Sequence, residues 1–166
     1  MNIDEFYGNE AKLNSFLKYF GNKKLLRKEE YSKDLVNAHI DKAKHNLKFF
    51  DKNKDDFVYC DWMIVTLYYA LYHCALALVA NKGYISKNHT ATLLFLMKYY
   101  GFQKDEINLI DELFVSKNDA EFYTILQNDR HDANYSTSIK FSKEQIDDYR
   151  TKVLNFLFKV QGIVLL

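Results

Sequence analysis

The sequence predicts an all-α protein, a single domain over residues 1–166 built as an up-and-down bundle of five or more helices. Apolar residues recur at helical spacing along most of the chain. The chain contains no proline and only five glycines, so the turn residues that a strand-rich fold requires are scarce. Its length of 166 residues suits one domain, which can bury a core without help from a metal or a disulfide.

Two apolar stripes mark outer helices of the expected bundle. Each stripe repeats at intervals of three and four residues, in helices expected at 33–52 and 142–161. These intervals bring side chains to one face of a helix, so each stripe predicts a buried face. The stripes consist of Val36, Ile40, Ala43, Leu47 and Phe50 in the first helix, and of Ile146, Tyr149, Val153, Phe156 and Val160 in the last.

A long helix is expected at about 56–81, and its middle is apolar on all sides from Ile64 to Ala80. Such a helix requires at least three covering neighbours, or two neighbours and a second subunit. The apolar run is shorter than the ~20 residues of a membrane span and contains His73. We therefore expect the core helix of a bundle, ended by Gly83 in a left-handed conformation.

Shorter helices complete the expected bundle, at about 9–20, 89–100, 104–115 and 119–134. Ser142 with Gln145 forms the pattern of a capping box, and Asn118 with Glu121 resembles one more loosely. The segment that ends at Asn88 offers side-chain oxygens to cap the helix at 89–100.

Composition and cysteine usage narrow the function classes. A net charge of +1, from 23 basic and 22 acidic residues, gives no global field for nucleic acid, so any such contact needs a local patch. Cys60 and Cys74 lack a CxxC pattern, which predicts buried thiols in a reducing cytoplasm. His39 and His45 are six residues apart and do not share a helix face as a metal pair would. We expect no metal, no cofactor, no signal peptide and no membrane association.

Three segments in the middle and late chain resemble one family. Residues 68–75, 82–90 and 130–135 have the sequences YYALYHCA, KGYISKNHT and RHDANY. They resemble the YYA-x-F-H-A-A core helix, the KG…SH turn and the late R-x-x-A-D-Y signature of the HEPN family. The resemblance covers about residues 62–135. It implies a homodimeric helical module that binds a nucleotide or RNA phosphate and partners a separate minimal nucleotidyltransferase, in a system of toxin–antitoxin type.

The chain departs from the ribonuclease branch of that family. That branch carries an arginine followed four to six residues later by a histidine, but Tyr135 lies five residues after Arg130 and the window contains no histidine. A tyrosine, with a pKa near ~10, is a poor general base at neutral pH. A non-catalytic module is therefore favoured. The alternatives are a metal-independent endoribonuclease using Arg130 with His89 or His131, and a purely structural interaction protein.

Arg130 and Asn134 are the first candidate ligand-binding residues. They lie one turn apart on a predicted helix, where a guanidinium and an amide can grip one phosphate. The structural alternative is an ion pair of Arg130 with a neighbouring aspartate. Tyr135 either presents its hydroxyl to the same place or packs as a helix-ending core residue.

His89 and Lys87 form a second candidate site, at the expected start of a helix whose free N–H groups can hold an anion. The alternative is ordinary capping beside a surface histidine. His73, on an apolar helix, is expected to be a hydrogen-bonded core residue. Among the many aromatic residues, the pairs at 99–100 and 122–123 are the best candidates for an exposed patch or a subunit seam.

Overall fold

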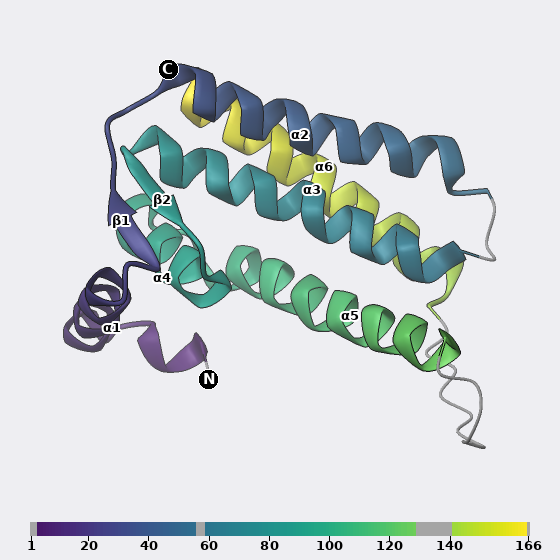
Figure 1. Ribbon diagram of the computed structural model, residues 1–166, viewed down its shortest axis with the longest axis horizontal. Helices are drawn as coiled ribbons and strands as arrows, with labels where there is room; N and C mark the ends of the chain where they lie inside the picture. The colour runs from purple at the N-terminus through teal and green to yellow at the C-terminus, as the bar shows by residue number, and fades with distance from the viewer. Residues whose placement is uncertain (1–2, 56–58, 129–140, 166) are drawn as a thin grey trace.

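The computed structural model describes residues 3–55, 59–128 and 141–165. These residues form helices and one short two-stranded ribbon, so the predicted all-α bundle is confirmed (Figure 1). In chain order the elements are η1 (Ile3–Phe6), α1 (Glu10–Asn22), β1 (Leu26–Lys28), α2 (Lys33–Asn53), α3 (Cys60–Asn81), β2 (Tyr84–Ser86), α4 (His89–Tyr100), α5 (Lys104–Asn128) and α6 (Lys143–Val164).

Side chains cap the starts of α1, α2, α4 and α6, and the caps of α4 and α6 are the two that the sequence predicted. Asn88 Oδ1 accepts a hydrogen bond from the Ala91 N–H at 2.9 Å, at the start of α4. The predicted capping box is present at the start of α6, where Ser142 and Gln145 each accept a hydrogen bond from the other's backbone N–H. These bonds satisfy N–H groups that have no partner within the helix, so the sequence sets both boundaries locally.

The core is built around α3, with α2 and α5 flanking it and α6 behind it in the view of Figure 1. The predicted stripe of α2 is fully buried, and that of α6 is buried except for the half-buried Tyr149. At the surface, Arg150 of α6 holds Asp51 of α2 with two hydrogen bonds of 2.9 and 3.1 Å. The two predicted stripes thus pack on one core with the central helix.

Among the described residues, α3 is the helix with the length and apolar composition of a membrane span. The core helix of a bundle meets the same criteria, and 72% of the most apolar window of α3 is buried inside the protein. Cys74 is buried on this helix as predicted, whereas Cys60 in its first turn is only half-buried. The helix begins at Cys60, and the start expected near residue 56 lies outside the described residues.

The prediction of two helices at 104–115 and 119–134 was wrong in the part that can be compared. α5 runs without a break from Lys104 to Asn128. This segment contains neither glycine nor proline, so nothing in it stops a helix once begun. Asn118 and Glu121 therefore lie inside a helix and do not cap a new one.

A short antiparallel ribbon of β1 and β2 was not predicted. Leu26 pairs with Ser86 and Lys28 with Tyr84. Gly83, just before β2, adopts the predicted left-handed conformation with φ of +70°, and its carbonyl accepts a hydrogen bond from the Glu29 N–H at 2.8 Å. The two strands come from distant parts of the chain and are not joined by a hairpin turn. Neither local spacing nor turn residues could therefore predict their pairing.

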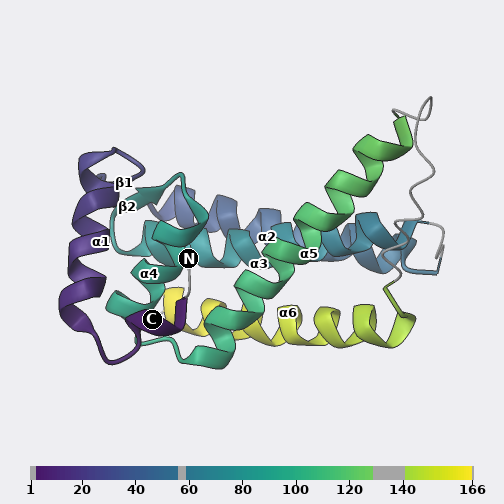
Figure 2. The ribbon, with the colours of Figure 1, turned by 90° about the horizontal axis from the view of Figure 1, so that it is seen from below.

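A second, smaller core lies at one end of the bundle, where α1 packs on α4 and the ribbon. Its buried members include Phe20 of α1, Leu26 of β1 and Phe95 of α4. Figure 2 shows this end opposite the far end of α5, which crosses α3 obliquely and leaves the other helices toward its C-terminus.

Candidate functional site

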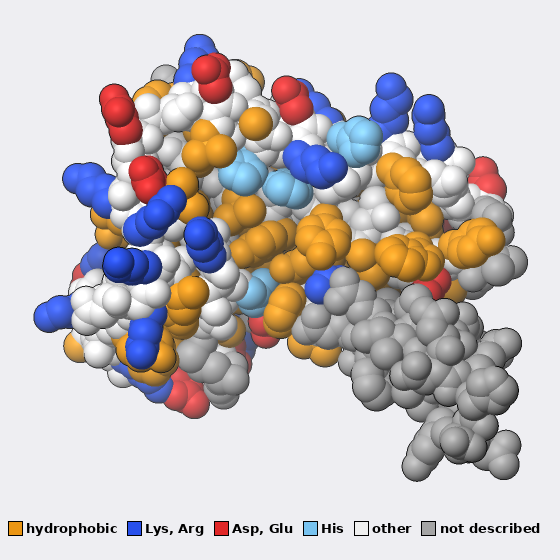
Figure 3. Space-filling view, in the orientation of Figure 1, with side chains coloured by type: hydrophobic (Ala, Val, Ile, Leu, Met, Phe, Trp, Pro, Cys, Tyr) orange, Lys and Arg blue, Asp and Glu red, His pale blue; other side chains and the backbone are white. Residues whose placement is uncertain are grey.

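None of the described helices covers one side of α3. Trp62, Thr66, Tyr69 and His73 recur along it at intervals of four, three and four residues, and none of these four is buried. Trp62 is 47% exposed and Tyr69 is 39% exposed. A band of hydrophobic side chains runs along the same part of the molecule, between α2 and α5 (Figure 3). We call these four residues the α3 face.

A stack of aromatic rings supports the α3 face and joins it to α4 and α5. His89 of α4 lies nearly parallel to Phe114 of α5, with ring centroids 3.9 Å apart. Tyr72 stacks on His89 at 5.9 Å and on Tyr68 at 5.5 Å. Tyr68 in turn contacts Tyr69 edge to face at 5.2 Å. The exposed ring of Tyr69 therefore rests on a packed aromatic layer.

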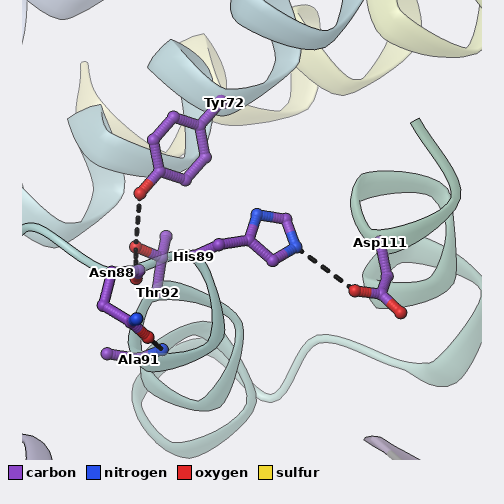
Figure 4. A network of polar contacts seen from close by, with 6 residues as sticks. All are labelled: Tyr72, Asn88, His89, Ala91, Thr92 and Asp111. Carbon is purple, nitrogen blue, oxygen red and sulfur yellow. Dashed lines mark hydrogen bonds and ion pairs between the residues drawn. The ribbon is translucent and has the colours of Figure 1, made fainter. Parts of the chain in front are cut away.

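The polar partner of His89 is the carboxylate of Asp111 on α5 (Figure 4). Nε2 of His89 lies 3.3 Å from Asp111 Oδ1, while Nδ1 is buried without a hydrogen-bond partner among the described residues. We therefore assign the proton of the neutral ring to Nε2. Burial lowers the pKa of His89, and the Asp111 carboxylate acts in the opposite direction. With Nε2 engaged and Nδ1 buried, neither nitrogen is placed to exchange a proton with a substrate.

Polar contacts also fix the first turn of α4 (Figure 4). Asn88 caps the helix through Ala91, which is the structural alternative to the predicted anion seat. The Tyr72 hydroxyl lies 3.3 Å from Thr92 Oγ1. The Thr92 hydroxyl in turn donates a hydrogen bond to Ser86 Oγ at 2.9 Å. These contacts tie α3, β2 and α4 together, so the turn that carries His89 is held by hydrogen bonds.

Lys117 of α5 brings a positive charge to the same place. Its Nζ lies 5.6 Å from the ring centroid of Tyr68 and 5.7 Å from that of Tyr69. The faces of aromatic rings attract cations, which holds the ammonium group beside the α3 face. A ligand that stacks on Tyr69 would find this charge next to it.

His73 of the α3 face pairs with His39 of α2, their Nδ1 atoms 3.0 Å apart. It is hydrogen-bonded as predicted, although half-buried rather than in the core. Burial, together with His39 and Lys42, lowers the pKa of His73 to about 4, and burial also lowers that of His39. Both rings are therefore neutral at neutral pH. In the described part of the chain, no group of three or more histidine, cysteine, aspartate or glutamate side chains could hold a metal ion.

Four predicted site residues lie outside the described residues: Arg130, His131, Asn134 and Tyr135. Their roles remain predictions. The last described residue of α5, Asn128, lies about 25 Å along the helix from Asp111, at 1.5 Å per residue. The contact between His89 and Asp111 is therefore well separated from the end of α5 that leads to those four residues.

The other predicted residues fall in different places. Lys87 is exposed at the end of the ribbon, where its backbone N–H donates a hydrogen bond to the carbonyl of Leu25, just before β1. Tyr99 is exposed, but Tyr100 is half-buried and donates its hydroxyl to a backbone carbonyl of α3 at 2.7 Å. The side chains of Phe122 and Tyr123 lie outside the described part of α5.

Sequence reasoning missed Trp62 and Tyr69 as surface residues. The spacing of the α3 face was visible in the sequence, but apolar or aromatic residues occur on every side of this helix, so spacing alone could not show which side stays uncovered. The available signal was that Trp62, Thr66, Tyr69 and His73, each with a polar atom in its side chain, fall on one side of the helix.

The arrangement suits binding better than proton transfer. It offers two exposed rings, of which Tyr69 rests on the packed aromatic layer with an ammonium group nearby, while both nitrogens of His89 are engaged or buried. No known protein family and no curated protein sequence matches the chain.

Proposed function

We propose that this chain is a HEPN-like module that binds a nucleotide, or a nucleotide unit of RNA, on the α3 face without catalysing a reaction. The observation that carries the proposal is the exposure of Trp62 and Tyr69 on one side of a buried helix, with Lys117 beside Tyr69. A base stacks on an aromatic ring for about 1–3 kcal/mol, and an ammonium group attracts the phosphate attached to that base.

The spacing of the two rings suits more than one base. Trp62 and Tyr69 are seven residues apart on α3, a rise of about 10 Å along the helix. A short single strand can therefore place different bases on the two rings. This geometry favours RNA or a dinucleotide over a single base buried in a closed pocket.

The contacts of His89 favour binding over ribonuclease chemistry. A general base needs a free nitrogen within reach of the proton it removes, and His89 has one nitrogen on Asp111 and the other buried. Cleavage of RNA that is lost in Arg130→Ala would contradict the non-catalytic proposal and favour the endoribonuclease alternative.

The proposed module acts with other chains. The resemblance to the HEPN family implies a homodimer and a separate minimal nucleotidyltransferase as partners. Light scattering of the purified protein tests the first, and copurification with a coexpressed nucleotidyltransferase tests the second. The third hypothesis, a purely structural interaction protein, predicts no nucleotide binding at all.

Calorimetric titration with nucleotides and short oligoribonucleotides tests the binding proposal. Trp62→Ala and Tyr69→Ala should each weaken binding at least about fivefold, because each removes one stacking ring. Tyr69→Phe keeps the ring and should bind like the wild type.

Phe158→Ala is the matched control, because Phe158 is 60% exposed and belongs to α6, which lies behind α3 in Figure 1. It should leave binding unchanged. An equal loss in Phe158→Ala, or no binding by the wild type, would contradict the proposal. Light scattering should give every variant the wild-type mass. A dimer that dissociates in Trp62→Ala would instead assign the α3 face to a subunit seam.

A further inference from the structure

The charged residues of this chain are segregated along the sequence. Residues 11–28 and 62–103 contain nine basic residues and no acidic one. Because the whole chain has 23 basic and 22 acidic residues, the remainder has 14 and 22. The two stretches carry a formal charge of +9 and the rest carries −8, which a net charge of +1 conceals.

The fold brings the basic parts of both stretches to one end of the bundle. β1 pairs with β2, and the Lys87 N–H donates to the Leu25 carbonyl at 2.8 Å, which sets Lys87 close to Lys24. Lysine and arginine side chains crowd this end of the molecule, around α1 and the ribbon (Figure 3). Six exposed residues make up what we call the basic end: Lys23, Lys24, Arg27, Lys28, Lys82 and Lys87.

Little of this charge is neutralised by acidic neighbours. Arg27 forms an ion pair with Glu29 at 2.9 Å, and the next residue after Glu29, Glu30, is also exposed. The five lysines of the basic end form no ion pair with any described residue. Lys12 and Lys98, from the same two stretches, do form ion pairs and are not counted in the basic end. Clustered charges of one sign raise the local potential and attract a polyanion.

Exposed tyrosines lie around the basic end. Tyr19 at the end of α1 is 53% exposed, with Lys23 Nζ 5.9 Å from its ring centroid. Tyr99 is 43% exposed and lies 5.9 Å from the ring of Tyr84, which is paired with Lys28 across the ribbon. Lysines beside open aromatic rings are the combination that binds single-stranded nucleic acids, because every base has a face that can stack.

We propose that the basic end binds the phosphate backbone of a single-stranded nucleic acid, with Tyr19 and Tyr99 as stacking platforms. This surface is separate from the α3 face, and the two need not bind the same molecule. The tyrosines distinguish this partner from an acidic protein, whose carboxylates would use the lysines alone.

The test is the salt dependence of binding to a fluorescent single strand of about 12 nucleotides, followed by anisotropy. The variant Lys24→Gln/Lys28→Gln/Lys87→Gln removes three charges at exposed positions. Each phosphate contact in a single strand contributes about 0.7 to the slope of log affinity against log salt, so the slope should fall by about 2. Binding at ~0.1 M salt should weaken about 100-fold.

The variant Lys44→Gln/Lys48→Gln/Lys52→Gln is the control, since it makes the same charge change at exposed positions of α2. It should keep the wild-type slope. An equal fall in slope in this control would overturn the proposal, because net charge rather than the basic end would then explain binding. Tyr99→Ala should weaken binding about fivefold or more.

Two other ligands complete the test. Binding to a duplex of the same length as tightly as to the single strand would overturn the stacking role. Tighter binding to phosphatidylserine vesicles than to the oligonucleotide would assign the surface to membranes instead. The α3 face is monitored separately by titration with a mononucleotide, which the triple lysine variant should bind like the wild type.

Discussion

The histidine pair of α2 and α3 makes the stability of the folded protein depend on pH. His39 and His73 face each other with Nδ1 atoms 3.0 Å apart, so one ring donates and the other accepts while both are neutral. Adding a proton to both would place two positive charges in contact, close to Lys42. The native state therefore resists protonation of His73, whereas an unfolded chain does not.

Stability should fall as the pH drops from about 6.5 to about 4. The pKa of His73 is about 4 in the folded protein and ~6.5 in an unfolded chain, so over this range the unfolded state binds more protons. We expect the free energy of unfolding to fall by about 1 kcal/mol. This is less than the whole difference in the pKa of His73 would give, because solvent screens a ring that is only half-buried. Urea unfolding of the wild type and of His73→Asn at both pH values measures it.

His45→Gln serves as the control, since His45 is exposed on α2. It should keep the wild-type pH dependence, whereas His73→Asn should flatten it. An unchanged pH dependence in His73→Asn would show that the pair does not link folding to this titration.

At the scale of elements, Gly83 is the joint between the core helix and the ribbon. Its φ is +70°, and a Cβ built there would lie 3.0 Å from the Glu29 carbonyl oxygen. Gly101, after α4, has a φ of +64° but no atom within 4 Å of such a Cβ. A substitution at either glycine would strain the backbone, but only a side chain at Gly83 would also contact a neighbouring atom too closely.

Gly83→Ala should therefore destabilise the protein more than Gly101→Ala. The left-handed conformation alone costs a non-glycine residue about 1–2 kcal/mol. We expect about 1 kcal/mol for Gly101→Ala and about 2 kcal/mol or more for Gly83→Ala, where β1 must also shift. Chemical denaturation measures the free energy of unfolding of both variants. An equal decrease in the two variants would show that the ribbon accommodates the extra methyl group without loss of stability.

The helices were predictable wherever their signals are local. The stripes of α2 and α6, the capping box at Ser142 and the cap at Asn88 all lie within a few residues of what they determine. The ribbon depends on a pairing of Leu26 with Ser86 across sixty residues, which no local pattern encodes. The division of α5 failed because a possible cap at Asn118 does not stop a helix that lacks a breaker.

The candidate site was predictable only in part. The resemblance to the HEPN family includes the helix with Tyr68, Tyr72 and His73, and His89 after the turn. The aromatic stack connects these two elements. Their neighbours on α5, Asp111 and Phe114 in particular, are set by the way that helix crosses α3. Such a crossing depends on tertiary packing, so the sequence alone could not supply it.

At the scale of the whole molecule, two surfaces differ in kind. The α3 face is aromatic and lies over the main core, whereas the basic end is charged and lies over the second core. A polynucleotide could engage both, with its bases on one and its phosphates on the other, or each could serve a different ligand. The separate tests above decide between these arrangements.

The most direct measurement of nucleotide binding on the α3 face uses Trp62, which is the only tryptophan of the chain. A base that stacks on this exposed indole should quench its fluorescence as nucleotide is added. We predict a saturable quench for the wild type, weakened in Tyr69→Ala and unchanged in Phe158→Ala. Nucleotide binding that calorimetry detects without any change in Trp62 emission would contradict the proposed site.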